Sequence, residues 1–401
     1  MAGSYDIIVD INISKLNISL NDAAPEEIAL CNNSASCCRT SFRFLFDNET
    51  SDYVQACTNV DVPLYVSPVN GSIYQAPTKK ELGNEYYVVC PSFGIRCSVV
   101  VGFVEDNANI TVKFSNESLT YNLTMGGSEI LFTNHVDIIL SPLNRSVIFT
   151  CNCDLTGVFI QSNATIALFS LTRHNLFSST TFPLPPVENW DTQYTLVAMN
   201  DSHVDESVII MTSEPNSYIK VSGQAIVRVP TAGSYMYASF GTDIILDIKA
   251  SYPVMVVHVG NLVDIDTTSV ISIFPPLKNK KMCLTFDNVS TSLHFIFQED
   301  TGSVDINCSD SSITSSNATN TTLTYRTDAH VTIGVTDYII SKIIVSPSSI
   351  GCQIKTTGLV HGYAYTFDGS DLQVYTVGNG IHVCFVMNFY LHTSQNDLLL
   401  V

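Results

Sequence analysis

Hydrophobic residues along this chain fall into short runs that are either continuous or alternate with polar residues. The runs are about four to eight residues long, Gly, Pro, Asn, Asp and Ser bound them, and amphipathic helical periodicity is nearly absent. Alternation with a period of two is typical of a strand with one buried face. The pattern predicts strands at 86–90, 98–104, 110–114, 136–140, 146–150, 165–171, 207–211, 244–248, 254–259, 293–297, 341–345, 362–367 and 381–387.

The predicted strands follow one another about every ten residues, with polar turns between them. This spacing is typical of antiparallel sandwiches and barrels and not of a βαβ sheet. The expected fold class is therefore all-β, built from tandem antiparallel β-sandwich-like repeats of about 90–110 residues.

Internal similarity indicates the repeats. Residues 85–89, 98–101 and 110–112 align with 193–197, 207–210 and 219–221 at offsets of 108 or 109. Residues 166–169 align with 254–257 at an offset of 88, and the pair Pro185-Pro186 precedes the pair Pro275-Pro276 by 90. Since proline lacks the N–H that a sheet ladder needs, each pair is expected to end one unit.

On this basis the chain divides into an N-terminal segment and three repeats. Residues 1–72 fit the repeat poorly, contain cysteines, and are interpreted as part of a preceding module. Repeat 1 covers 73–183, repeat 2 covers 184–274 and repeat 3 covers 275–393. Within repeat 3, the Ser/Thr/Asn-rich insertion 309–324 has too little apolar surface to fold alone and is expected to be a glycosylated loop.

The low and mostly negative charge of the chain excludes some classes of partner. Only 14% of the residues are charged, and 37 Asp and Glu outnumber 18 Lys and Arg. Such a surface repels phosphate backbones and anionic headgroups, so nucleic acid is not an expected partner. No apolar run reaches the roughly 18–20 residues of a membrane span, so direct membrane insertion of this chain is not expected.

Asn-X-Ser/Thr sequons are dense. Together with the low charge they favour a surface covered by N-glycans, because sugars supply the solubility that charges otherwise provide. The candidate glycosylation sites are Asn109, Asn116, Asn122, Asn144, Asn163, Asn200, Asn288, Asn317 and Asn320, with further sequons at Asn12, Asn17, Asn32, Asn48, Asn70 and Asn307.

Twelve cysteines fit an oxidising compartment, where thiols at this density normally pair. Cys90 and Cys97 flank a turn-like segment between two predicted strands and are expected to be bonded to each other. Two further pairings are predicted, Cys283 with Cys308 and Cys352 with Cys384.

Cys151 and Cys153 form a C-x-C pair without the second pair of ligands that a tetrahedral zinc site needs. Because alternate residues of a strand point the same way, these two cysteines are expected to enter separate disulfides.

Sequons and cysteines together predict a secreted protein or one at the extracellular surface. The first residues contain neither a basic segment nor the apolar core of a secretory signal. The chain is therefore interpreted as a fragment of a longer secreted or surface protein. A cytosolic protein with unused sequons is the competing interpretation, and the cysteine content weighs against it.

The segment 182–194, Phe-Pro-Leu-Pro-Pro-Val-Glu-Asn-Trp-Asp-Thr-Gln-Tyr, resembles the N-terminal domain of the IgG-Fc-binding protein family. That pattern has Leu-Pro-Pro-Val, then a Trp, then an aromatic residue that opens a strand. The matching residues are Leu184, Pro185, Pro186, Val187, Trp190 and Tyr194. Residues 82–89 resemble the opening strand of the preceding repeat, and 358–365 the closing strand of the domain, so the resemblance covers roughly 74–375.

The resemblance implies an extracellular glycoprotein of the mucin-associated or cell-surface kind. Asp191 stands where the family usually has Gly, and 171–183 lacks the cysteine usually found before the proline pair. Disulfide pattern and ligand preference therefore do not transfer directly, and the Fc-binding label serves as a family name.

Motifs of zinc proteases, serine hydrolases, phosphate loops and dinucleotide sites are absent from the sequence, so no catalytic, cofactor or metal residue is predicted and the protein is not expected to be an enzyme. Asp264 and Asp266 could share a strand face and hold Ca²⁺, but a solvated turn fits better because no third acidic ligand follows. The stretch from Asp368 to Asp371 is typical of a hairpin turn.

Two single residues have competing interpretations. His258 lies in an apolar strand and is expected to pack with one ring nitrogen satisfied. Trp190 could anchor a ligand, but its position directly after a proline pair favours pinning one repeat on the next.

The predicted function is an extracellular binding or adhesion module whose ligand is a protein or a glycan, contacted mainly by loops of the repeats. A secreted hydrolase acting on glycans or peptides is the first alternative, and a carboxylate pair about 5–10 Å apart in a cleft would favour it. A structural component of mucus or matrix is the second.

Overall fold

The computed structural model of the chain describes its strands and the loops that join many of them. The described residues are 3–11, 15–20, 26–29, 38–46, 53–58, 64–68, 74–75, 82–90, 96–103, 108–114, 121–125, 128–132, 134–140, 146–173, 179–198, 204–240, 245–262, 267–273, 277–278, 281–285, 291–300, 302–310, 324–333, 336–345, 349–367, 372–376, 384–388, 391–394 and 397–400. The described side chains lie between residues 82 and 362.

The described part of the chain is nearly all strand, which confirms the predicted all-β fold class. Repeat 1 is one nine-stranded antiparallel sheet. Its strands are β8 (Gly83–Tyr87), β9 (Arg96–Phe103), β10 (Ala108–Lys113), β11 (Tyr121–Met125), β12 (Ser128–Phe132), β13 (His135–Leu140), β14 (Ser146–Cys151), β15 (Phe159–Arg173) and β16 (Ser179–Leu184).

Repeat 2 is a seven-stranded sheet that a single 3-10 turn, η1 (Val187–Asn189), joins to repeat 1. Its strands are β17 (Asp191–Val197), β18 (Val204–Thr212), β19 (Ser217–Val221), β20 (Val227–Val229), β21 (Tyr235–Ser239), β22 (Ile245–Leu262) and β23 (Thr267–Ile273).

Repeat 3 divides into a six-stranded and a three-stranded sheet. Its strands are β24 (Leu277–Lys278), β25 (Lys281–Thr285), β26 (Thr291–Gln298), β27 (Ser303–Asp310), β28 (Thr324–Ile333), β29 (Thr336–Val345), β30 (Ser349–Thr357), β31 (Leu359–Phe367) and β32 (Leu372–Thr376). Pro275, Pro276 and most of the 309–324 insertion lie outside the described residues.

The N-terminal segment forms two four-stranded sheets, and the second of them includes a strand from the far end of the chain. The N-terminal strands are β1 (Gly3–Ile11), β2 (Lys15–Leu20), β3 (Glu26–Ala29), β4 (Cys38–Phe46), β5 (Tyr53–Thr58), β6 (Leu64–Pro68) and β7 (Tyr74–Gln75), and the C-terminal ones are β33 (Cys384–Asn388), β34 (Leu391–Ser394) and β35 (Asp397–Leu400). β33 pairs with β5, so both ends of the chain build one sheet.

All four groups of strands share one pairing scheme. The N-terminal half of β15 lies on the outside of the molecule and pairs with β8 and β10. Its C-terminal half lies nearer the centre and pairs with β9 and β16; these are called the outer and inner halves below. The halves of β22 pair in the same way, first with β17 and β19 and then with β18 and β23. In repeat 3, β30 pairs with β25 and β27, and β31 with β26 and β32. In the N-terminal group, β5 pairs with β33 and β2, and β6 with β1 and β7.

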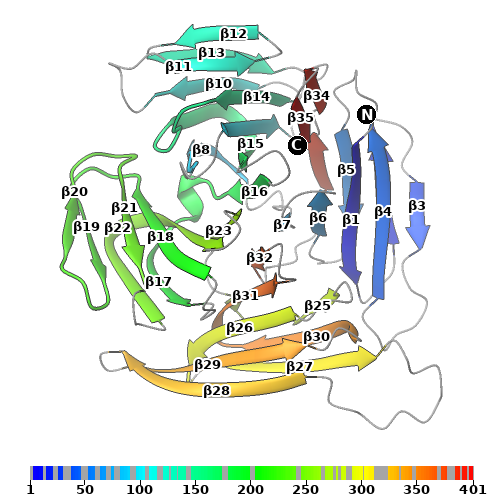
Figure 1. Ribbon diagram of the computed structural model, residues 1–401, viewed down its shortest axis with the longest axis vertical. Helices are drawn as coiled ribbons and strands as arrows, with labels where there is room; N and C mark the ends of the chain where they lie inside the picture. The colour runs from blue at the N-terminus through cyan, green and yellow to red at the C-terminus, as the bar shows by residue number, and fades with distance from the viewer. Residues whose placement is uncertain are drawn as a thin grey trace.

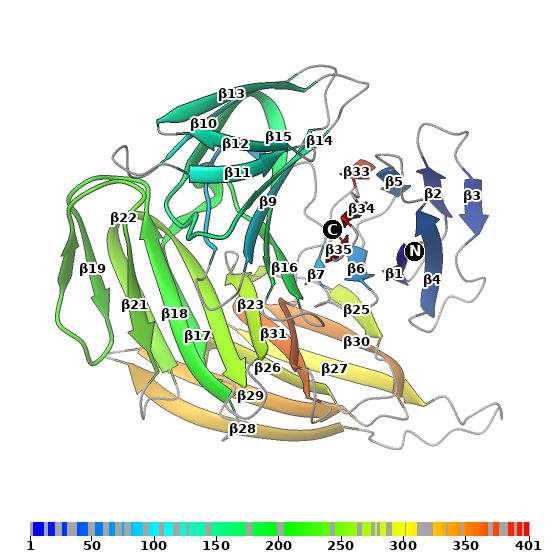
Figure 2. The same ribbon diagram turned by 45° about the horizontal axis from the view of Figure 1, so that its top comes forward.

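The innermost strands of the four groups close a ring. β7 contacts β16, β16 contacts β23, β23 contacts β32, and β32 contacts β7. Figure 1 shows these four strands around the centre, with the four groups of sheets arranged about them. Figure 2 shows β33 beside the N-terminal strands from a second direction. The arrangement resembles that of a propeller, in which radial repetition protects the sheet edges.

The structure differs from the expectation in three places. β7 and β33, expected in repeats 1 and 3, belong to the N-terminal sheets, and two predicted strands are one. Residues 244–248 and 254–259 were predicted as separate strands, whereas both belong to β22. Residues 251–253 between them are exposed, and the pairing with β17 shifts register at this point. Pro253 is tolerated there because a bulge does not need its missing N–H.

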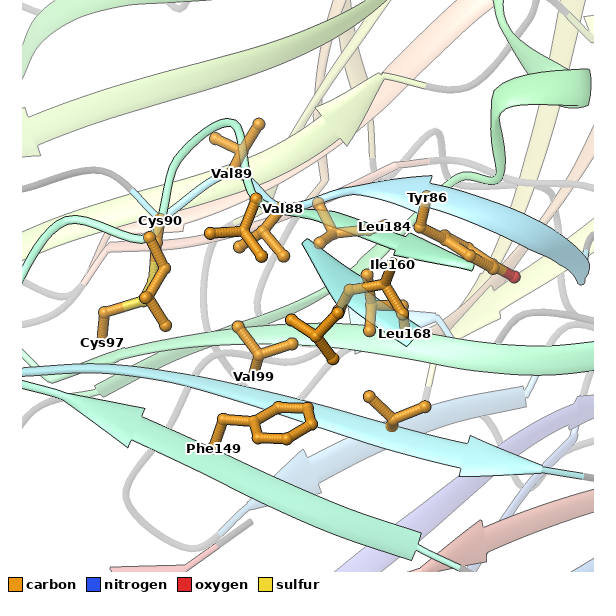
Figure 3. Close-up of a cluster of buried hydrophobic side chains, with 14 of the residues drawn as sticks. Tyr86, Val88, Val89, Cys90, Cys97, Val99, Phe149, Ile160, Leu168 and Leu184 are labelled. Carbon is orange, nitrogen blue, oxygen red and sulfur yellow. A yellow bond between two sulfur atoms is a disulfide. The ribbon is translucent and has the colours of Figure 1, made fainter. Parts of the chain in front are cut away.

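The core of repeat 1 consists of alternate residues of its strands, as the hydrophobic pattern predicts. Tyr86, Val99, Phe149, Ile160 and Leu168 are all buried in one cluster (Figure 3). The same cluster continues into repeat 2, because side chains of the inner halves of β18 and β22 pack against it; these are Ile209, Met211, Met255, Val257 and Val259. Repeats 1 and 2 therefore share a core.

Candidate functional site

The residues of the Pro-Pro motif lie where repeat 1 meets repeat 2. The Nε1 of Trp190 donates a hydrogen bond to the carbonyl of Pro185 at 3.1 Å, and its ring lies 5.8 Å from that of Tyr87. Leu184 and Trp190 are both buried in the shared core. Gly83 packs so closely on Pro186 that a Cβ added to the glycine would lie 2.5 Å from the proline Cβ. Trp190 thus joins the two repeats.

Two buried tyrosines repeat one arrangement. The hydroxyl of Tyr86 donates to the Ile166 carbonyl at 2.6 Å and accepts from the N–H of Gly83 at 2.9 Å. The hydroxyl of Tyr194 donates to the Val254 carbonyl and accepts from the N–H of Asp191, both at 2.9 Å. Burial raises the pKa of both phenols above the ordinary value. Each ring fixes the first strand of its repeat to the bend of the long strand.

Two disulfides hold the loops at the end of repeat 1. Cys90 and Cys97 are bonded with their Cα atoms 6.0 Å apart, which is the pairing expected from the sequence. Cys151 and Cys153 are bonded to each other, so the expectation of separate disulfides for this pair was wrong. The chain bends directly after β14, and this brings the two Cα atoms to 5.0 Å, closer than alternate residues of an extended strand.

The loop that follows is fixed at several points. The hydroxyl of Thr156 accepts from the N–H of Cys90 and donates to its carbonyl, both at 3.0 Å. The N–H of Gly157 donates to the Val88 carbonyl at 2.9 Å. One carboxylate oxygen of Asp154 accepts from the N–H of Thr156 at 2.8 Å. The exposed Asp154 is therefore held in place by a rigid loop.

Asp154 meets a pair of tyrosines from repeat 2. The Tyr235 hydroxyl donates to the second carboxylate oxygen of Asp154 at 3.3 Å. Tyr235 and Tyr237 alternate on one face of β21, and their rings meet edge to face at 5.6 Å. Gly233 (φ 76°) leads into β21, and a Cβ added there would lie 2.8 Å from the Tyr87 ring. We call Asp154, Tyr235 and Tyr237 the junction surface.

The pKa values of both phenols of the junction surface are raised. Burial, followed by the charge of Asp154, raises the pKa of Tyr235 to about 12. The same two causes raise the pKa of Tyr237, whose side chain is 46% exposed. The Tyr235 hydroxyl already donates its one proton to Asp154. The surface suits recognition, since it offers aromatic area and a fixed carboxylate in one place.

Other sequence-predicted residues are placed as follows. His258 is buried, with Nε2 2.8 Å from Oε2 of Glu206 and its ring 5.3 Å from that of Phe240. Asn109 and Asn163 are exposed on neighbouring strands, and Oδ1 of Asn163 accepts from the N–H of Asn109 at 2.8 Å.

The remaining candidates cannot be placed by their side chains. Asp264, Asp266, Asp368 and Asp371 lie outside the described residues, as do Asn116, Asn144, Asn200, Asn288, Asn317 and Asn320, and only the backbone of Asn122 is described. The backbone register sets Cys352 opposite Cys308 in β27, and Cys384 opposite Cys57 in β5. The pairings Cys283 with Cys308 and Cys352 with Cys384 stay predictions.

The described residues contain neither a metal-binding cluster nor a membrane-spanning helix. No group of three or more His, Cys, Asp or Glu side chains among them could hold a metal ion. In the same part of the chain, no helix has the length and hydrophobicity needed to cross a membrane.

Sequence reasoning missed the junction surface because its residues come from different repeats. Asp154 follows the C-x-C pair, and the tyrosines belong to a Tyr-Met-Tyr alternation at 235–237. The alternation indicates that both rings share a face, but nothing local indicates that Asp154 would meet them.

Comparison with known proteins gives a family match. A family model described as IgGFc binding protein matches residues 74–338. No curated protein matches the chain. A solved alpha-L-rhamnosidase of Streptomyces avermitilis, crystallised with L-rhamnose, aligns with 98% of this chain and 55% of its own, at 8% identity and a TM-score of 0.15. The chain spans about half the length of that enzyme, and a likeness this low carries no argument.

Proposed function

This chain belongs to the IgGFc-binding protein family, and from this premise we propose that it is a secreted glycoprotein that binds an extracellular protein or glycan without chemically altering it. The single observation that carries the proposal is the junction surface, where Tyr235, Tyr237 and Asp154 from two repeats meet on a rigid base.

The junction surface has the properties of a binding contact. Tyrosine is enriched among the residues that dominate binding energy, since its ring buries a large area and its hydroxyl forms a hydrogen bond. The disulfide Cys151–Cys153 and the bonds of Thr156 fix the loop before any ligand arrives. A fixed loop loses little conformational entropy on binding, and this favours affinity.

An extracellular location is part of the proposal. Disulfides such as Cys90–Cys97 persist in oxidising compartments and are rare in the cytosol. The sequons at Asn109 and Asn163 lie at exposed strand positions that a glycosyltransferase could reach. Adhesion, as distinct from capture of a soluble ligand, would follow if the natural ligand is part of a matrix or cell surface.

The test is capture of ligands from extracellular fluid by the glycosylated chain, read by mass spectrometry, followed by affinity measurements on the captured ligand. Tyr237→Ala should weaken binding about tenfold, because truncation of a central tyrosine commonly costs more than 1 kcal/mol. Asp154→Asn should also weaken it while preserving the shape of the loop. Leu131→Ala is the matched control, since Leu131 is 69% exposed on β12 and not part of the junction surface.

Hydrolysis of a glycan or peptide by the purified chain, abolished by replacing one carboxylate, would contradict the proposal. So would a captured ligand whose affinity is unchanged by both junction variants. Failure to bind immunoglobulin Fc would not contradict it, because the residues of the junction surface specify no particular protein.

A further inference from the structure

The sequons are distributed unevenly over the four groups of strands. The N-terminal group, repeat 1 and repeat 3 each contain four or five of them, whereas none lies between Asn200 and Asn288. This interval contains β18 to β23 and therefore most of the repeat 2 sheet. N-glycans attached to the chain cannot start from this part of the surface.

The sheet face in this interval presents an unusual set of side chains. In β19, Ser217, Ile219 and Val221 are buried, so Tyr218 and Lys220 point outward. Tyr218 is 52% exposed and lies opposite Arg228 of β20.

Its other neighbour is β22. The Tyr218 N–H donates to Oγ of Ser251 at 2.9 Å, and Lys220 is the register partner of Lys249. We call Tyr218, Lys220, Arg228 and Lys249 the bare face.

The bare face is cationic on a strongly acidic protein. It holds three of the 18 Lys and Arg, while the whole chain has a formal net charge of −19. The Nζ of Lys249 lies 3.2 Å from Oδ2 of Asp247, so this carboxylate offsets one of the three positive charges and the set as a whole stays positive.

We propose that the bare face docks an acidic surface of a protein partner, in addition to any ligand of the junction surface. Charge complementarity selects an anionic partner, and Tyr and Arg are the residues that most often anchor protein interfaces. A protein interface needs about 800 Å² per partner free of obstruction, and no sequon between Asn200 and Asn288 places a glycan on this part of the chain. A terminal sugar needs much less bare area, so the absence of sequons over the whole interval favours a protein.

Single substitutions can place a glycan on the bare face. Lys220→Asn completes a sequon with Ser222, and Lys249→Asn completes one with Ser251. Lys220→Gln removes the same charge without adding a sugar. His330→Asn completes a sequon with Thr332 on β28 of repeat 3, at an exposed position, and is the matched control for the sugar itself.

The probe is a fluorescent peptide of Glu, Asp, Gly and one Tyr, with polysialic acid as an anionic glycan and a Lys-rich peptide as the charge control. The chain should bind the acidic peptide, more weakly as salt increases, and not the Lys-rich one. Lys220→Glu combined with Lys249→Glu should weaken binding by at least about tenfold. Glycosylated Lys220→Asn should abolish it, Lys220→Gln should reduce it less, and His330→Asn should leave it unchanged.

Three results would overturn the proposal: no binding of the acidic peptide, binding that the double charge reversal leaves intact, or tighter binding of polysialic acid that the same reversal removes. The last would assign the face to anionic glycans. Tyr237→Ala should leave binding of the acidic peptide unchanged. The proposal for the bare face and the proposal for the junction surface can therefore fail independently. Equal thermal stability of each variant and the parent excludes a folding defect.

Discussion

At the scale of single residues, a buried tyrosine has the same structural role in repeats 1 and 2. Tyr86 and Tyr194 each join the first strand of a repeat to the middle of its longest strand through a buried hydroxyl. A buried hydroxyl with both of its bonds made stabilises modestly, but removing it leaves backbone groups without partners.

Tyr86→Phe should therefore lower the free energy of unfolding by about 1–3 kcal/mol, because the N–H of Gly83 and the carbonyl of Ile166 lose their buried partner. Tyr194→Phe should have an effect of the same size for the same reason. Denaturant titration followed by tyrosine and tryptophan fluorescence measures both. Tyr218→Phe, at an exposed position, is the control and should change stability by less than about 0.5 kcal/mol.

Alkaline pH should destabilise the protein through its tyrosines. Tyr235 has its pKa raised to about 12, and the pKa of Tyr86 and Tyr194 is raised as well, whereas unfolded tyrosines ionise near 10. Above pH 10 the folded state therefore holds more protons than the unfolded state, so stability is complete below pH 10 and falls as pH rises through the folded pKa. Denaturation midpoints at pH 8 and pH 11 measure this. Equal midpoints would contradict it.

At the scale of elements, the long strands determine how the repeats are built. β15 and β22 each change partners at a bend and so belong to two parts of a curled sheet. The inner halves then pack on neighbouring repeats, and the core of repeat 2 includes Ile296 and Ile340 from repeat 3. Among the described residues, buried side chains thus form continuous clusters across the junction of repeats 1 and 2 and the junction of repeats 2 and 3.

The junction of repeats 2 and 3 should be sensitive to acid. Burial, then the charge of Lys342, lowers the pKa of His294 in β26 to about 3. A hydrogen bond to the Ala198 backbone raises this pKa by a smaller amount, and the nearby His258 lowers it slightly. In the unfolded chain this histidine titrates near 6.5, so its contribution is complete above pH 6.5 and is lost as pH falls toward 3.

His294→Gln should make unfolding less dependent on pH between 6.5 and 4, and His330→Gln, at an exposed site, should not. Thermal melting followed by circular dichroism at three pH values measures the slope. An unchanged slope in the His294 variant would show that other groups cause the acid sensitivity.

At the scale of the whole molecule, the ring is closed by β33. This strand takes the place beside β5 that β8, β17 and β25 take in the three repeats. A ring has no terminal repeat with an open edge, whereas a linear array of sandwiches has two.

Truncation after residue 383 should therefore expose the edge of β5 and loosen the N-terminal group. Amide exchange in 53–58 should accelerate, and the melting temperature should fall. Truncation after residue 394 is the control, because among the described strands β35 pairs with β34 alone and its loss leaves the closing pair intact. Unchanged amide exchange after truncation at residue 383 would mean that the ring does not depend on β33.

The sequence alone determined the all-β class, many of the strands from residue 86 onward and the Cys90–Cys97 bond. These follow from period-two alternation, turn residues and short separations along the chain, all of which are local. The family pattern around Trp190 was local as well.

Only the tertiary structure decided that 244–248 and 254–259 join in one strand, that Cys151 bonds to Cys153, that Asp154 meets Tyr235, and that β33 closes the ring on β5. The first two depend on how the chain bends at a point where either outcome satisfies the local pattern. The last two join residues that are distant along the chain. Their pairing is selected by packing of whole sheets, which the period of a strand does not encode.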